Sequence, residues 1–142
     1  LRIQMLYGFM VWVPLVAAII TTFIGESLVG ILFGAPYSQA AGVLIIQTWS
    51  GIFVFMGVAS GKWFLTENLQ IIWFWRVFYG MFINILLNIF LIPRYGIQGA
   101  AFSTLATLSV TAYFSDFFNK KTRPIFYTKT KALLLIRGLG SK

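Results

Sequence analysis

Long apolar stretches alternate with short polar connections along the chain. Four stretches, 5–25, 40–61, 71–92 and 97–118, approach the length of about 20 apolar residues that a helix needs to cross a bilayer. The first two hold no charge, whereas the third holds Arg76 near its start and the fourth holds Asp116 near its end. The connections contain glycine, proline or charged residues, which interrupt apolar helices. The pattern therefore predicts an all-α integral membrane bundle, with four transmembrane helices within residues 1–118.

The composition agrees with this pattern and restricts the chemistry. Hydrophobic residues make up 59% of the 142 residues and charged residues 10%, whereas a soluble domain carries roughly 25% charged residues. The chain has no histidine, no cysteine and three acidic residues, so it offers no metal cluster, no nucleophile with its base and no carboxylate pair. We therefore expect no catalytic residues, no metal and no cofactor, and we expect that the protein is not an enzyme.

The basic residues are distributed unevenly about the four stretches. When the stretches are threaded back and forth across a membrane, ten of the eleven basic residues fall on one side and Arg94 alone falls on the other. Lysine and arginine near span ends favour the cytoplasm, so both ends of the chain are expected there. The basic tail, 119–142, directly follows a span. It is therefore predicted to be cytoplasmic or interfacial and to contact anionic membrane lipids rather than nucleic acid.

Polar residues within the third stretch are candidate binding residues. Arg76, Asn84 and Asn88 recur at intervals of four with Gly80 between them, so they share one broad helix face. Such a face is costly in lipid and should meet protein or a water-filled cavity. For Arg76, a cavity role and extension toward the headgroups are equally supported, while hydrogen bonds between helices are favoured for the asparagines. Lys62 is a further candidate cation.

The three acidic residues lie at predicted span ends. They are Glu26, Glu67 and Asp116. A carboxylate at a helix end can reach water, so we expect all three to be solvated, with pairing to Lys62 or Arg76 as an alternative for Glu67.

Two motifs follow one another in the chain. Phe33, Gly34, Tyr37 and Ala40 form an FGxxYxxA loop after the first apolar stretch. A second motif, NxxxNxxLIPxxGxxGAA, comprises Asn84, Asn88, Leu91, Ile92, Pro93, Gly96, Gly99, Ala100 and Ala101. This order, which covers the chain to about Phe118, resembles the C-terminal half of the Wzx-like flippases for O-antigen and capsular polysaccharide. These belong to the multidrug, oligosaccharidyl-lipid and polysaccharide exporter superfamily.

The resemblance implies a larger transporter. Family members have about twelve to fourteen spans in two pseudo-symmetric bundles, and this chain would form roughly the last four of twelve. The chain begins at Leu1 rather than Met, so we expect a missing N-terminal bundle as its partner. Members carry undecaprenyl-diphosphate-linked oligosaccharides across the bacterial cytoplasmic (inner) membrane by alternating access.

The resemblance also implies roles for individual residues. Arg76, Asn84, Asn88 and Lys62 become candidates for binding the lipid-linked glycan. The structural motif residues would be Gly34, Tyr37, Pro93, Gly96 and Gly99.

Two other functions remain open. A multidrug exporter of the same superfamily would carry amphipathic cations and favour acidic residues within the membrane, and the absence of acids at mid-span argues against it. In a non-transporting membrane scaffold, every polar row would serve only to pack helices together.

Overall fold

The computed structural model describes residues 2–134, with side chains from residue 5 onward. Within this part every element is helical, as the apolar pattern predicts. The chain forms α1 (Arg2–Phe33), η1 (Ala35–Tyr37), α2 (Ser38–Thr66), α3 (Gln70–Ser109), η2 (Val110–Phe114), α4 (Ser115–Phe118) and α5 (Arg123–Leu133). The side chains of Arg2, Arg137 and Lys142, which enter the charge count, lie outside the described residues.

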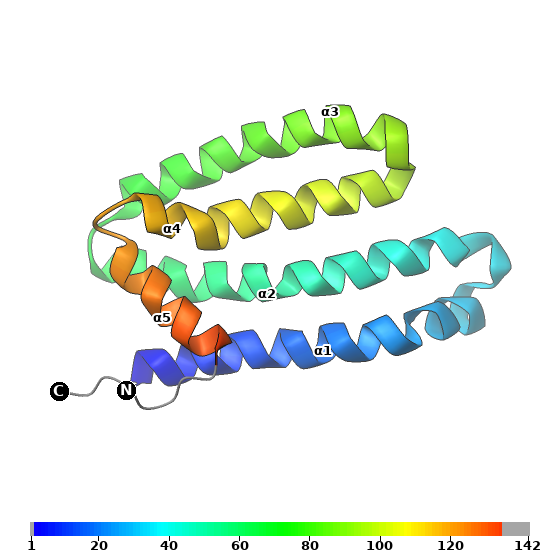
Figure 1. The fold of residues 1–142 in the computed structure, drawn as a ribbon, viewed down its shortest axis with the longest axis horizontal. Helices are drawn as coiled ribbons and strands as arrows, with labels where there is room; N and C mark the ends of the chain where they lie inside the picture. Colours follow the sequence, from blue (N-terminus) through cyan, green and yellow to red (C-terminus); the bar gives the residue numbers. More distant parts are fainter. Residues whose placement is uncertain (1, 135–142) are drawn as a thin grey trace.

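Within residues 2–134, three helical stretches are long and apolar enough to cross a membrane. They are Met5–Phe33, Ala35–Thr66 and Gln70–Phe118. The third has 49 residues and, if straight, would extend about 74 Å, more than twice the hydrocarbon thickness of a bilayer. It instead reverses at Gly96, where φ is 58° and ψ is −137°, and its two arms run antiparallel (Figure 1). The third and fourth predicted spans are therefore the two arms of one long helical stretch.

The helices extend beyond the predicted span ends. α1 continues past Gly25 and through Glu26 to Phe33, and α2 continues through Lys62 to Thr66. A single charge on an exposed helix face leaves the backbone hydrogen bonds intact. The chain leaves the helical conformation where the backbone adopts a positive φ, at Gly34 (83°) and Asn68 (54°).

The reversal in α3 depends on the predicted motif residues. Pro93 lacks a backbone N–H and so weakens the helix just before the bend, while Gly96 supplies the positive φ. Gly99 follows at a point of close approach. A Cβ atom at Gly99 would overlap the backbone carbonyl of Leu91. Proline and glycine in this motif therefore permit the two arms of α3 to turn and meet.

The two ends of the bundle hold different elements (Figure 1) and different numbers of basic residues. We name the end with the Gly34 and Gly96 turns the turn end, and the end with the α2–α3 connection, α4 and α5 the basic end. Among the described side chains, the basic end holds Lys62, Arg76, Lys120, Lys121, Arg123, Lys129 and Lys131. The turn end holds Arg94.

A small buried core lies toward the basic end. Tyr7 and Val11 of α1 pack with Met56 of α2 and with Ile125 and Ala132 of α5. Much of the remaining apolar surface is exposed, including Phe23 at 82% and Ile31 at 83%. Exposed aromatic and aliphatic side chains over whole helices suit contact with lipid and not with water.

Candidate functional site

The four candidate binding residues do not form one site. Arg76 lies near the start of α3, and Asn88 lies 12 residues further along the same arm, about 18 Å away along the helix axis. Lys62 lies on α2 with an exposed side chain. The predicted row along α3 is thus a line of polar groups that spans much of the bundle.

The asparagines connect the two arms of α3. Asn84 donates a hydrogen bond from Nδ2 to Oγ1 of Thr107 over 3.3 Å, and Asn88 donates from Nδ2 to Oδ1 of Asn84 over 2.9 Å. The first of these is an interhelical bond of the kind expected from the sequence. Oδ1 of Asn88 is buried without a hydrogen-bond partner among the described residues. The row therefore packs the arms together and leaves one acceptor that can take a further donor.

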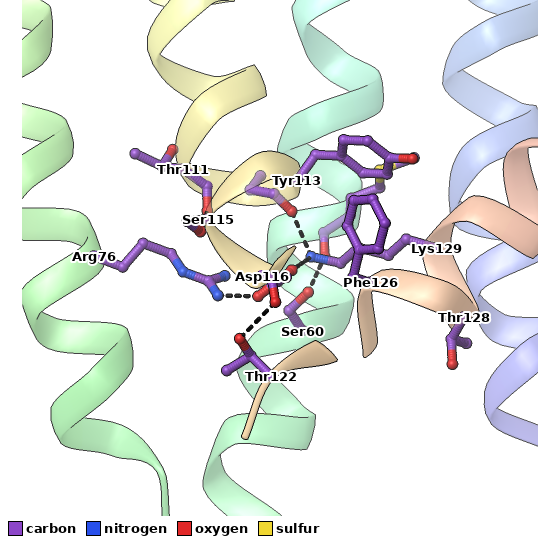
Figure 2. Close-up of polar contacts among 12 residues, drawn as sticks. Ser60, Arg76, Thr111, Tyr113, Ser115, Asp116, Thr122, Phe126, Thr128 and Lys129 are labelled. Carbon is purple, nitrogen blue, oxygen red and sulfur yellow. Dashed lines mark hydrogen bonds and ion pairs between the residues drawn. The ribbon is translucent and has the colours of Figure 1, made fainter. Parts of the chain in front are cut away.

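Arg76 belongs to a buried ion cluster at the basic end (Figure 2). Its guanidinium donates to Oδ1 of Asp116, while Nζ of Lys129 donates to Oδ2 of Asp116 over 2.6 Å. The Asp116 and Lys129 side chains are fully buried, and the Arg76 side chain is 8% exposed. We call these three residues the Asp116 cluster. It joins α3, α4 and α5 through a single carboxylate.

Local structure brings Asp116 to this position. The π-helical segment η2 precedes α4, and its wider turn changes the face on which the following residues lie. After α4, the Thr122 hydroxyl donates to the backbone carbonyl of Asp116 over 2.9 Å. This bond ties the connection between α4 and α5 to the backbone of Asp116.

The sequence of α5 places Lys129 in the interior. Ile125, Lys129 and Ala132 are the buried residues of α5, and their spacing of four and three aligns them on one helix face. Nζ of Lys129 also donates to the backbone carbonyl of Ala112 in η2. Burial lowers the pKa of Lys129 from 10.5 to about 8, although the Asp116 carboxylate opposes the shift.

Two cations and one anion make the cluster net positive. Arg76 is also positioned over the Phe64 ring of α2, 4.5 Å from the centroid, which further stabilises the guanidinium. A buried charge is tolerated when it is paired and hydrogen-bonded, and Asp116 serves both cations. The carboxylate is therefore the group on which the cluster depends.

The expectation that Asp116 is solvated is wrong. Although it lies near the end of the fourth stretch, α5 folds back over this end and covers it. Glu26 and Glu67 are exposed, as expected. The sequence does contain a signal for the cluster, because Lys129 shares the apolar face of α5 with Ile125 and Ala132, and a buried lysine requires an anion nearby.

The predicted motif residues lie at the turn end, away from the cluster. Gly34 and Gly96 occupy the two turns, and Tyr37 is 57% exposed with its ring 6.0 Å from that of Phe33. Pro93 and Gly99 flank the second turn. These residues shape the turns.

The chain is similar to a protein of polysaccharide biosynthesis. It is 25% identical over 118 residues to the capsular polysaccharide biosynthesis protein CapF of Staphylococcus aureus. The match covers 78% of this chain and 28% of that protein, so the chain spans less than a third of its relative. No protein-family model and no solved structure matches the chain. The similarity supports a role connected with polysaccharides.

Proposed function

We propose that this chain forms part of a transporter that moves a lipid-linked oligosaccharide across the bacterial cytoplasmic membrane for surface polysaccharide biosynthesis. The observation that carries the proposal is the similarity to a capsular polysaccharide biosynthesis protein in a chain built of membrane-length helices. Sugars attached to a lipid diphosphate do not cross a bilayer unaided, because the charged and polar groups are costly in hydrocarbon. A helical bundle that alternates its access between the two sides supplies the route.

The charge distribution supports an orientation for this transporter. Exposed basic residues gather at the basic end, which we place in the cytoplasm. The lipid diphosphate of the substrate would then approach from the basic end. Lys62 is an exposed cation there, and a lysine can pair with a phosphate oxygen by a charge-assisted hydrogen bond.

Arg76 would have a different part in transport. Its guanidinium is engaged by Asp116 and Phe64, so we assign it to holding α3 in register with α4 and α5. The carboxamides of Asn84 and Asn88 lie deeper along the same arm. The acceptor Oδ1 of Asn88 suits a hydrogen bond from a sugar hydroxyl of the substrate.

The proposal is tested in cells that lack the complete protein carrying this chain. Their surface polysaccharide should be lost and lipid-linked oligosaccharide should accumulate, and the intact gene should restore export. The Lys62→Ala variant should lower export about tenfold at equal protein level, since one charge-assisted hydrogen bond is worth about 1.5–3 kcal/mol. Arg94→Ala, which removes an exposed cation at the turn end, is the matched control.

The outcomes separate the competing functions. Normal polysaccharide together with increased sensitivity to cationic drugs would replace the proposal with multidrug export. Normal polysaccharide and normal drug sensitivity, together with loss of a membrane complex, would favour a scaffold. Equal export by Lys62→Ala and the unaltered protein would remove Lys62 from the pathway.

A further inference from the structure

The outer face of α5 differs from the face that packs against the bundle. Arg123, Tyr127, Lys131 and Leu134 are all exposed, with Tyr127 at 55% and Leu134 at 61%. Their spacing of four, four and three aligns them along one side of α5, with Leu134 as the residue that follows its last turn. We call them the outer row. Two cations thus alternate with an aromatic and an aliphatic side chain on the exposed side of α5.

This mixture suits neither bulk water nor hydrocarbon. Tyrosine and leucine gain from contact with the acyl boundary, while lysine and arginine side chains can extend to phosphate groups. A short amphipathic helix with these residues lies in the headgroup region of a bilayer.

The position of α5 in the fold agrees with a place in the headgroup region of the bilayer. The membrane-length stretch ends at Phe118, and α5 begins at Arg123 after a short connection. α5 packs against α1 at the basic end and crosses the ends of the long helices obliquely (Figure 1). Exposed Lys120 and Lys121 stand in the connection, directly before the outer row.

The Asp116 cluster fixes the direction in which the outer row faces. Lys129 is fully buried and bonded to Asp116, so α5 cannot rotate about its axis without removing that ammonium from its carboxylate (Figure 2). Of the three acidic residues in the chain, Asp116 is enclosed in the cluster, Glu26 lies on α1 toward the turn end, and Glu67 is exposed in the α2–α3 connection. α5 itself carries no acidic residue within Arg123–Leu133.

We propose that the outer row of α5, with Lys120 and Lys121, is a binding surface for the headgroups of anionic phospholipids in the surrounding membrane. The cations pair with lipid phosphates, and Tyr127 and Leu134 rest against the glycerol and upper acyl region. The bound molecule is a lipid of the surrounding membrane, so this proposal does not depend on which molecule the protein transports.

The test measures lipid binding by the complete protein in a neutral detergent. Native mass spectrometry resolves each bound lipid during titration with phosphatidylglycerol or with phosphatidylcholine of the same chain length. The unaltered protein should bind the first phosphatidylglycerol several-fold more tightly than phosphatidylcholine. Lys131→Gln and Lys121→Gln should each weaken phosphatidylglycerol binding about fivefold and leave phosphatidylcholine binding unchanged.

Arg94→Gln provides the matched control, because it removes one exposed cation at the turn end. Both lysine side chains are exposed and make no ion pair within the described part of the chain, so thermal unfolding without added lipid should be the same in all variants. Equal affinity for the two lipids would overturn the proposal. The proposal would also be overturned if Lys131→Gln kept the full preference for phosphatidylglycerol, or if Arg94→Gln weakened phosphatidylglycerol binding as much as Lys131→Gln does.

Discussion

Replacement of Asp116 by asparagine tests the role of the buried cluster most sharply. Asp116→Asn keeps the size of the side chain and removes its charge. The Arg76 side chain, 8% exposed, and the fully buried Lys129 side chain would then lie together without their common anion. The docking of α5 on the bundle should be weakened most, because Lys129 is the residue of α5 that enters the cluster.

The magnitude follows from the burial of both cations. Removal of one partner from a buried ion pair costs about 3–5 kcal/mol, because the other charge is left uncompensated. Lys129→Met is different, since it leaves a neutral pair of Arg76 and Asp116 and replaces a desolvated ammonium by an apolar side chain. Such a change costs little or is stabilising. The double variant Asp116→Asn/Lys129→Met should therefore recover part of the stability that Asp116→Asn alone loses.

Cysteine labelling measures the docking of α5 directly. The chain has no cysteine, so a single cysteine at Ala132, which is 6% exposed and faces the core, reports on α5 alone. Asp116→Asn should raise its rate of reaction with a maleimide on the order of a hundredfold, as expected for a loss of about 3 kcal/mol in the opening equilibrium. Lys129→Met should raise the reaction rate of this cysteine only slightly. Equal acceleration by both variants, or none by Asp116→Asn, would refute the assigned role of the carboxylate.

Two further predictions concern the turn and the buried lysine. Gly99→Ala should lower the stability of the folded bundle by about 2 kcal/mol or more, because its Cβ would overlap the Leu91 carbonyl. Gly61→Ala is the control, since its new Cβ would meet open space, and it should leave stability unchanged. Thermal unfolding in detergent measures both. The pKa of Lys129 is about 8 in the folded state and 10.5 in the unfolded state, so the unfolded state binds more protons between these pH values. The free energy of unfolding should therefore rise with pH across this window. Lys129→Met should lack this part of the pH dependence, and the same slope in both proteins would contradict the role given to Lys129.

Much of the fold follows from the sequence because bilayer crossing imposes simple requirements. Length and apolarity are local properties, so they indicate the long helices without knowledge of their neighbours. The turns are also local, since Gly34 and Gly96 adopt the positive φ that glycine permits. The helices continue past the predicted span ends at Gly25 and Gly61, because a charge next to an apolar stretch ends the hydrophobic pattern without ending the helix.

The ion cluster could not be placed in the same way. Asp116 contacts one residue 40 positions before it and another 13 positions after it, across a π-helical segment that the apolar pattern does not reveal. Its burial depends on α5 folding back over the bundle, which is a tertiary event. The interhelical bond of Asn84 was easier to expect, since a carboxamide in an apolar arm must find a partner on a neighbouring helix.

The proposed transport of a lipid-linked oligosaccharide by the complete protein carrying this chain is tested most directly in liposomes. The protein is reconstituted in liposomes that contain an undecaprenyl-diphosphate-linked oligosaccharide, and a membrane-impermeant glycosidase is then added. We expect cleavage to proceed beyond the fraction in the outer leaflet, because oligosaccharide from the inner leaflet is carried outward. Cleavage that stops at the level of protein-free liposomes, with the protein folded and inserted, would contradict it.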